Sequence, residues 1–342
     1  MWEMRFRNVP NRFVGSLTIP TFATFNTFNT FLKFPTFNTL PTLFNMAGGL
    51  KEVRERIKSV INTQQITKAM KMVSAAKLRK AQNAIVQVRP YADRLNRMLS
   101  NILSNLDGGA NTSFGTAREV KNVLVVVITS NRGLCGAFNT NICKETTALI
   151  NEKYGKQRRD GNVSMLFIGK KGYDYFRRRL RDVTFITDFI DVYDNPAYEN
   201  VSRVARARMD EFSTGKYDAV EIVYSRFKNA ATVFPTSEQW LPVPKMEAPA
   251  GAKVAKADYI FEPDQQQLLE TLVPSILQLS FHKCVLDTQA SEHGSRMTAM
   301  DKATENAEEL LKALKIHYNK KRQEAITTEL GEIVSGAAAL EG

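Results

Sequence analysis

The sequence predicts an α/β protein in which two long terminal helices form an antiparallel coiled coil and a Rossmann-like α/β domain lies between them. Apolar residues recur at three- and four-residue steps over residues 50–106 and again over 264–340, which is the period of a helix with one packed face. Between these stretches, residues 120–245 alternate short apolar runs with helical segments, the order typical of a parallel sheet with crossover helices.

Composition limits the class of protein. The chain has 342 residues, of which 43% are hydrophobic and 24% are charged, so a packed core is expected. The net charge of +12 predicts an acidic partner surface, which could belong to nucleic acid, anionic lipid or an acidic protein. None of the three cysteines lies in a C-x-x-C pair, which argues against a cysteine zinc site or a disulfide framework. No apolar run reaches the roughly 18 residues that a membrane span needs.

Residues 1–46 are a low-complexity extension that we exclude from the predicted fold. Phe occupies every third position from Phe22 to Phe37, a period that fits neither a helix nor a strand. The segment is Thr-rich, and Glu3 is its only acid, which suggests an organelle transit peptide. We favour a misplaced start codon upstream of Met46, because the triplet repeat resembles translated repetitive DNA. A chain that begins at Met46 is therefore expected to assemble normally.

The N-terminal helix is predicted within residues 47–110. It would span roughly 85 Å, which is too long to bury against one domain, so it needs a partner helix. Pro90 is expected to bend it. Residues 50–106 hold twelve Lys or Arg and three Asp or Glu. This cationic face has three interpretations: a solvated surface, a surface for an acidic protein, or a nucleic-acid site. The last is weakened because no aromatic residue interrupts residues 50–88.

The C-terminal helix is predicted within residues 264–342 and would reach roughly 115 Å. Two long helices at opposite ends of one chain most simply pair antiparallel. Pro274 marks a possible kink near its start. The stretch Val334–Leu340 is small and uncharged, which fits either a slender tip or a frayed terminus.

The middle domain is predicted within residues 118–245, followed by a surface linker at 246–263. The predicted strands are 123–128, 165–168, 219–224 and 232–234, and the predicted helices are 137–152, 170–181 and 200–212. The loop after the first strand contains Arg132, Gly133 and Gly136. It matches neither common phosphate-binding pattern, so the two glycines are expected to serve a tight turn.

Residues for catalysis or metal binding are sparse. Cys135 lies in that loop, but the three histidines all lie in the C-terminal helix region, so a local Cys–His pair has no support. We expect no catalytic residue, no metal and no cofactor. By composition alone, a basic coiled-coil nucleic-acid binder and a nucleotide-dependent enzyme are the alternative functions.

Three sequence blocks resemble the gamma subunit of the F-type ATP synthase, the central rotor shaft. The blocks lie within residues 57–79, 131–139 and 291–338, and the resemblance covers essentially all of residues 47–342. The third block is the most specific; it includes Ser291–Met300, Arg322–Leu330 and Glu332–Ala338.

The resemblance implies a fold, partners and contact residues. The paired helices would form a shaft inside a ring of alpha and beta subunits, and the middle domain a foot on the membrane c-ring beside the epsilon subunit. The active sites would belong to the ring. Five positions carry over as shaft contacts with the alpha and beta subunits: Met70, Lys71, Arg296, Gln323 and Thr327. Gln323 and Thr327 are one helical turn apart and so share a face.

The resemblance also implies a role and a location. The chain would couple proton-driven rotation of the membrane ring to conformational change at the beta subunits, without nucleic acid and without crossing the membrane. We expect it at the cytoplasmic face of a bacterial inner membrane; the alternative is the matrix side of the mitochondrial inner membrane. The middle domain lacks the cysteine-pair insert of the chloroplast version, so no thiol switch is expected.

Overall fold

The computed structural model describes residues 49–104, 114–115, 118–230, 232–243 and 265–341. The predicted extension at 1–46 and the predicted linker at 246–263 lie outside these residues. We call the paired terminal helices the shaft and residues 118–243 the foot.

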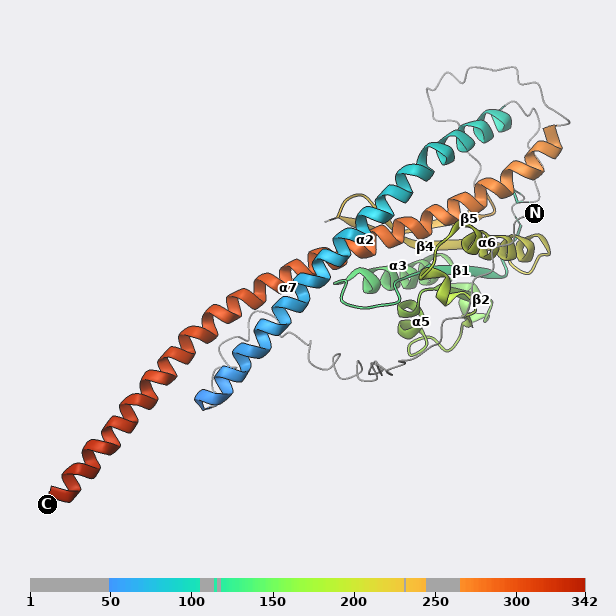
Figure 1. The fold of residues 1–342 in the computed structure, drawn as a ribbon. Helices are drawn as coiled ribbons and strands as arrows, with labels where there is room; N and C mark the ends of the chain where they lie inside the picture. Colours follow the sequence, from blue (N-terminus) through green and yellow to red (C-terminus); the bar gives the residue numbers. More distant parts are fainter. Residues whose placement is uncertain (1–48, 105–113, 116–117, 231, 244–264, 342) are drawn as a thin grey trace, which may run out of the picture. The chain divides into compact units, whose positions relative to one another are not determined.

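The shaft consists of α2, Leu50–Ser104, and α7, Gln265–Glu341. Their 55 and 77 residues correspond to lengths of roughly 80 and 115 Å. Both helices continue through an internal proline, Pro90 in α2 and Pro274 in α7. They cross and run side by side, while α7 continues past the start of α2 toward the C-terminus (Figure 1).

Contacts along the shaft show that the helices are antiparallel. Going up α2 through Arg54, Thr67 and Lys71, the hydrogen-bonded partners run backwards along α7 through Tyr318, Thr304 and Asp301. The same register continues into an apolar cluster that contains Leu78, Ala81, Ile85, Leu286 and Ala290. A constant register over this length is what heptad-spaced seam residues produce.

The foot is built on one five-stranded sheet, ordered β3-β2-β1-β4-β5. The strands are β1 Val123–Ile128, β2 Val163–Ile168, β3 Thr184–Ile186, β4 Ala219–Phe227 and β5 Val233–Leu241. Neighbouring strands are parallel except β5, which runs antiparallel to β4 at the edge. All six residues of β1 are buried, as a central parallel strand requires.

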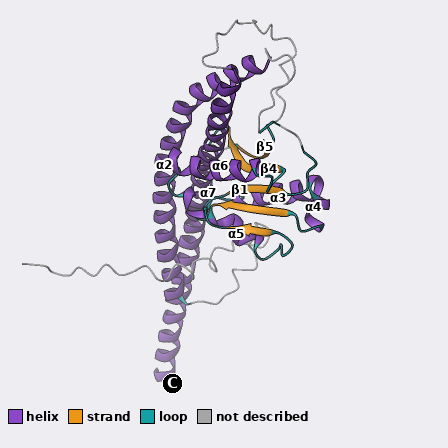
Figure 2. Ribbon diagram, turned by 90° about the vertical axis from the view of Figure 1, so that its right-hand side faces the viewer, coloured by secondary structure: helices purple, strands orange, loops and turns teal. Residues whose placement is uncertain are grey.

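Helices cover both faces of this sheet (Figure 2). One face packs against α3, Phe138–Lys153, and α5, Lys170–Phe176, around Val125 and Phe167. The opposite face packs against α6, Tyr198–Ser213, and against the first half of α7. The second long helix is therefore part of the foot's own core as well as of the shaft. The predicted fold class is confirmed.

Two element predictions were wrong in length by five residues or more. The helix predicted at 170–181 ends at Phe176, because the chain then turns to bury Leu180 and to stack Arg179 on the Tyr175 ring at 3.8 Å. The strand predicted at 232–234 extends to Leu241. Its polar, half-exposed residues hide an edge strand from a search for apolar runs. Three short elements were not predicted: α4 Gly155–Arg159, β3, and the 3-10 turn η2 Ile190–Tyr193.

Candidate functional site: the joint between foot and shaft

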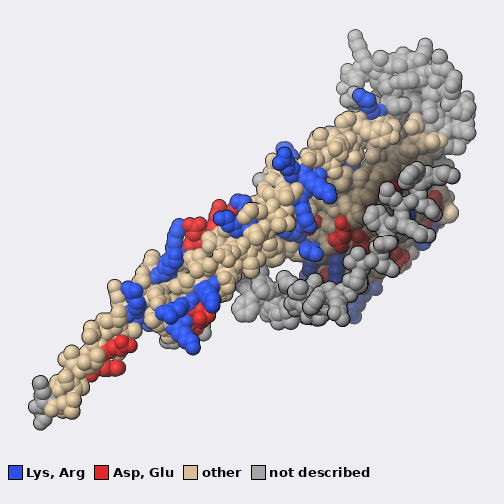
Figure 3. Space-filling model, viewed as in Figure 1, with Lys and Arg blue, Asp and Glu red and all other residues tan. Residues whose placement is uncertain are grey.

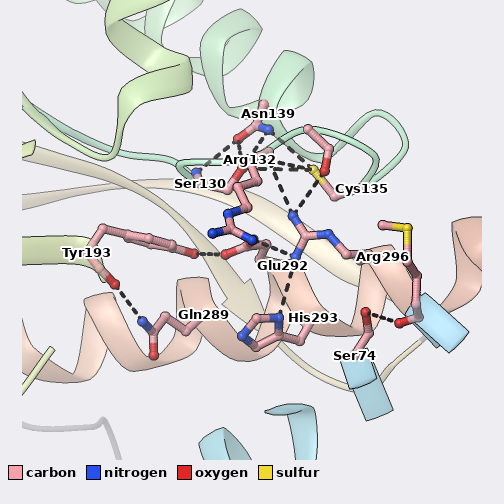
Figure 4. A network of polar contacts seen from close by, with 12 residues as sticks. Ser74, Ser130, Arg132, Cys135, Asn139, Tyr193, Gln289, Glu292, His293 and Arg296 are labelled. Carbon is pink, nitrogen blue, oxygen red and sulfur yellow. Dashed lines mark hydrogen bonds and ion pairs between the residues drawn. The ribbon is translucent and has the colours of Figure 1, made fainter. Parts of the chain in front are cut away.

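Arg296 of α7 binds the loop that follows β1, and we call this contact region the joint. The Nη2 atom of Arg296 donates to the carbonyl oxygens of Arg132, at 3.3 Å, and Gly133, at 3.1 Å. Its Nη1 atom lies 2.6 Å from Oε1 of Glu292, one turn earlier on α7. One guanidinium thus ties a loop of the foot to the shaft (Figure 4).

Glu292 extends the joint to a second segment of the foot. Its other oxygen, Oε2, accepts a hydrogen bond from the hydroxyl of Tyr193 in η2. Tyr193, Glu292 and Arg296 are 4%, 4% and 9% exposed. Burial raises the pKa of Tyr193, so the phenol keeps its proton and donates to the carboxylate. The side chain of Gln289 adds a 2.8 Å bond to the backbone oxygen of Tyr193.

The loop itself adopts an unusual backbone. Leu134 and Gly136 have φ angles of 63° and 61°, in the left-handed region. Gly136 meets the expectation that a glycine serves the turn. Gly133 does not have a positive φ; its contribution is the carbonyl that Arg296 binds. Leu134 takes a conformation that costs a non-glycine residue about 1–3 kcal/mol.

Internal hydrogen bonds hold this strained loop in place. Ser130 donates from its hydroxyl to the Arg132 carbonyl at 2.7 Å and from its backbone N–H to Oδ1 of Asn139 at 3.0 Å. The Asn139 amide also lies 3.3 Å from the sulfur of Cys135. The loop is therefore fixed at both of its ends, and it presents its carbonyls to Arg296.

A second loop of the foot touches α7 on another side. Gly294 lies against Ala230, in the connection between β4 and β5. A Cβ atom at Gly294 would lie 3.1 Å from the oxygen and 3.2 Å from the Cα of Ala230. Thr298, one turn further on, reaches the same oxygen at 3.4 Å. The absence of a side chain at Gly294 allows the backbones to approach closely.

The joint has no feature of a nucleophilic or metal site. Burial raises the pKa of the Cys135 thiol, so it remains a thiol at neutral pH and is a poor nucleophile. Among the residues described, no group of three His, Cys, Asp or Glu side chains is placed to hold a metal ion. The arrangement suits a mechanical connection, because its bonds join segments far apart in the sequence.

The predicted shaft contacts fall into two groups. Arg296 lies in the joint with the predicted loop residues Arg132 and Gly133, a contact that the sequence pattern does not indicate. Met70 and Lys71 lie on α2, half-buried, and the Lys71 ammonium group binds Asp301 of α7. Lys71 is therefore already paired inside the chain.

Gln323 and Thr327 lie far from the joint, on the C-terminal part of α7. Both are exposed and line a shallow open groove with Lys320, Glu324 and Thr328. The Thr327 hydroxyl donates to the Gln323 carbonyl at 2.9 Å. A partner can therefore only donate to the Thr327 oxygen, whereas the Gln323 amide remains able to donate and accept.

Sequence reasoning missed Glu292, Tyr193 and the seam pair Thr67 and Thr304. Glu292 precedes Arg296 by four residues, and this helical ion-pair spacing was a usable signal. Tyr193 carried no signal, because only the fold brings η2 to α7. The seam pair was hidden because a search for apolar periodicity passes over threonine.

Comparison with known proteins identifies the family. The sequence model of the family described as ATP synthase matches residues 49–340. A protein of Flavobacterium psychrophilum named ATP synthase gamma chain is 50% identical over 293 residues, which cover 86% of this chain and 99% of the relative. The chain belongs to the ATP synthase gamma-chain family.

Other comparisons agree with this assignment. The ATP synthase gamma chain of Cytophaga hutchinsonii is 49% identical and aligns over 85% of this chain and 98% of its own length. A chain of the Euglena gracilis mitochondrial ATP synthase shares the fold, with a TM-score of 0.58, 21% identity, and coverage of 85% of this chain and 94% of that one. As a gamma chain, the protein is a central-stalk subunit of an F-type ATP synthase. No described helix is long and apolar enough to span a membrane.

Proposed function

We propose that this gamma chain is the rotor shaft that couples proton-driven rotation of a membrane ring to conformational change at the catalytic beta subunits. An asymmetric shaft inside a three-fold ring must touch each catalytic subunit differently. Each contact would bias an open–closed equilibrium of that subunit and so change its nucleotide affinity. The same coupling would run backwards during hydrolysis.

The observation that carries the proposal is the joint. Among the residues described, torque applied to the foot would reach the shaft through the contacts between them, and α7 takes part in both. The buried Arg296–Glu292 pair binds two segments of the foot, at Arg132–Gly133 and at Tyr193. These internal bonds support a role for Arg296 in holding foot and shaft together. A contact between Arg296 and a catalytic subunit remains a prediction.

Gln323 and Thr327 are the strongest candidates for contacts with the ring. Both are exposed on a part of α7 that extends past the paired region. Met70 lies on α2 beside exposed Lys68, in the cationic stretch proposed to face an acidic beta-subunit loop. Figure 3 shows Lys and Arg along the paired helices, and after Arg322 the sequence has neither residue. The two regions would therefore contact the ring by different chemistry.

The proposed partners are the alpha and beta subunits of the ring, the epsilon subunit and the membrane c-ring. The proposed location is the cytoplasmic face of a bacterial inner membrane, which the bacterial relatives favour over the mitochondrial matrix. Isolating the chain from its host and identifying the subunits that co-purify tests the partner set. Isolation with nucleic acid alone would contradict it.

Coupling is tested with Arg296→Ala and Gln323→Ala in a reconstituted complex. Gln323→Ala would remove one or two hydrogen bonds of about 1 kcal/mol each, and Arg296→Ala would also leave the buried Glu292 carboxylate without its partner. Both changes should lower ATP-driven proton pumping at least several-fold. Hydrolysis should fall less, because the active sites themselves are unchanged. The ratio of pumping to hydrolysis is the measurement.

Thr328→Val is the matched control. Thr328 is also exposed, and its hydroxyl donates to the Glu324 carbonyl at 2.9 Å. It borders the same groove, but it lies about 100° around the helix from Thr327. It should leave the ratio unchanged, whereas Thr327→Val should lower it. Unchanged synthesis and hydrolysis in a complex carrying both alanine substitutions would exclude these residues from coupling.

A further inference from the structure

Two of the three histidines of the chain, His282 and His293, lie on α7 where it packs against the foot. They are eleven residues apart, which is close to three helical turns, so they share a face of the helix. Neither has a place in the coupling proposal. The contact of His293 requires an unprotonated ring nitrogen, and the ring of His282 is buried with one nitrogen that has no hydrogen-bond partner among the residues described.

His293 must accept a hydrogen bond from Arg296. Its Nδ1 atom lies 3.5 Å from Nη1 of Arg296, and a guanidinium has no acceptor, so Nδ1 holds a lone pair. A proton on Nδ1 would place two donors and two positive charges against each other. The charged groups that face His293 are Glu292 and Arg296 from α7 and Lys77 from α2. The single carboxylate would then be shared between two cations, which weakens its hold on Arg296.

His282 must donate to the foot. Its Nε2 atom lies 3.0 Å from the backbone oxygen of Pro196, which can only accept. In the neutral ring Nδ1 is therefore an unprotonated acceptor. Nδ1 is buried, and among the residues described it has no hydrogen-bond partner. The ring of Tyr198, from α6, meets the imidazole edge-on at 5.5 Å, and no charged group is among those that act on His282. A proton on Nδ1 would be a buried, unpaired donor on a buried cation.

We propose that His282 and His293 make the contact between foot and shaft acid-sensitive, so that protonation of either ring loosens the foot from α7 while the coiled coil stays paired. The paired part of the shaft near Thr67 and Thr304 contains no histidine and keeps its contacts. The joint is thus the part of the molecule that responds to a fall in pH.

The direction follows from burial. Burial lowers the pKa of both histidines below the value of about 6.5 that an exposed imidazole has. As the pH falls below about 6.5, the loosened state takes up protons and the packed state does not. The stabilisation is complete above that pH and is lost progressively below it.

Trp240 reports on this contact. It is 5% exposed, donates from Nε1 to the Leu277 carbonyl at 3.2 Å, and packs on Phe281, the neighbour of His282. The chain has one other tryptophan, Trp2, so Trp2→Phe leaves a single emitter. In the full-length chain we expect the emission of Trp240 to shift to longer wavelength as the pH falls from 7.5 to 5.5.

Two variants test whether the histidines cause this shift. The double variant His282→Gln, His293→Asn keeps one donor and one acceptor at each position and should show no shift. His317→Gln, on α7 beyond the joint, should behave as the parent.

Amide hydrogen exchange provides an independent measurement on the unaltered chain. After correction for intrinsic rates, exchange at residues 190–196 should rise at pH 5.5 relative to 7.5, while exchange at residues 54–71 should not. An emission shift that survives in the double variant, a shift abolished by His317→Gln, or equal exchange changes in both segments would overturn the proposal. These tests use the chain alone, so they are independent of the coupling function.

Discussion

At the joint, the free-energy cost of burying a charged side chain is offset by the bonds that the side chain makes to its partners. Removing the charges of Glu292 and Arg296 from water costs several kcal/mol per ion. Here the pair gains three further bonds, from Tyr193 and to two loop carbonyls. Deleting one partner would strand the other as a buried charge, which typically costs about 3–5 kcal/mol. The arrangement therefore favours a specific geometry more than a high stability.

Gly169 provides a test of the turn that supports the loop. It follows β2 with a φ of 98°, and a Cβ atom there would lie 1.9 Å from the Thr129 oxygen. Gly161 has a φ of 74° and open space around it. Gly161→Ala should cost only the backbone term of about 1–2 kcal/mol. Gly169→Ala must also displace Thr129 and should cost at least about 3 kcal/mol. Denaturant unfolding of the two variants measures this difference, and equal costs would show that the turn can relax.

At the scale of elements, the seam where α2 packs against α7 is apolar from Leu78 to Ile85 of α2 and polar in the stretch before Leu78. Between buried Val53 and Leu78, the buried residues of α2 are Thr67 and Ser74. The Thr67 and Thr304 hydroxyls lie 2.8 Å apart, and each also has a carbonyl acceptor in its own helix, Gln64 or Met300. One hydroxyl must donate across the seam while the other donates to its own helix.

A double-mutant cycle at this pair tests its contribution. Thr67→Val and Thr304→Val should each destabilise the chain by about 1 kcal/mol, because the remaining hydroxyl loses its cross-helix partner. The double variant should be close to the parent, since two apolar groups of the same shape then face each other. The cycle should give an interaction energy with a magnitude of about 2 kcal/mol in denaturant unfolding. Strict additivity would mean that the two hydroxyls do not cooperate.

Elements were predictable from the sequence where their periodicity was strong. The two long helices and β1 followed from apolar spacing, because packing imposes that spacing on every turn. The edge strand β5 and the short β3 did not, since half-exposed strands lack a continuous apolar run. The joint was predictable only in fragments. Arg296 and the Gly133 loop stood out as motifs, but contacts across more than 160 residues depend on the packed fold.

At the scale of the whole molecule, no helix in the part of the chain that the structure describes pairs with the C-terminal end of α7 (Figure 1). Among the residues described, the hydrogen bond between the two helices that lies furthest along α7 joins Arg54 to Tyr318, close to the start of α2. Beyond it, Ile326, Leu330, Ile333 and Val334 are 49% to 67% exposed. Exposed apolar residues along an unpartnered helix indicate a surface that another molecule covers. This agrees with the proposal that the end of α7 works inside a ring of other subunits.

A single helix of this length is only marginally stable in water, because most helix stability in proteins comes from packing. In the isolated chain, amides of residues 323–341 should therefore exchange quickly, while those of the paired residues 286–314 exchange slowly. In the assembled ATP synthase, residues 323–341 should become protected as the ring covers them. Hydrogen exchange followed by mass spectrometry, on the chain alone and in the complex, compares the two states within one sequence. Residues 286–314 are the internal control, since their partner α2 is present in both. Slow exchange of residues 323–341 in the isolated chain, or no gain of protection on assembly, would contradict a shaft end that is stabilised by its ring.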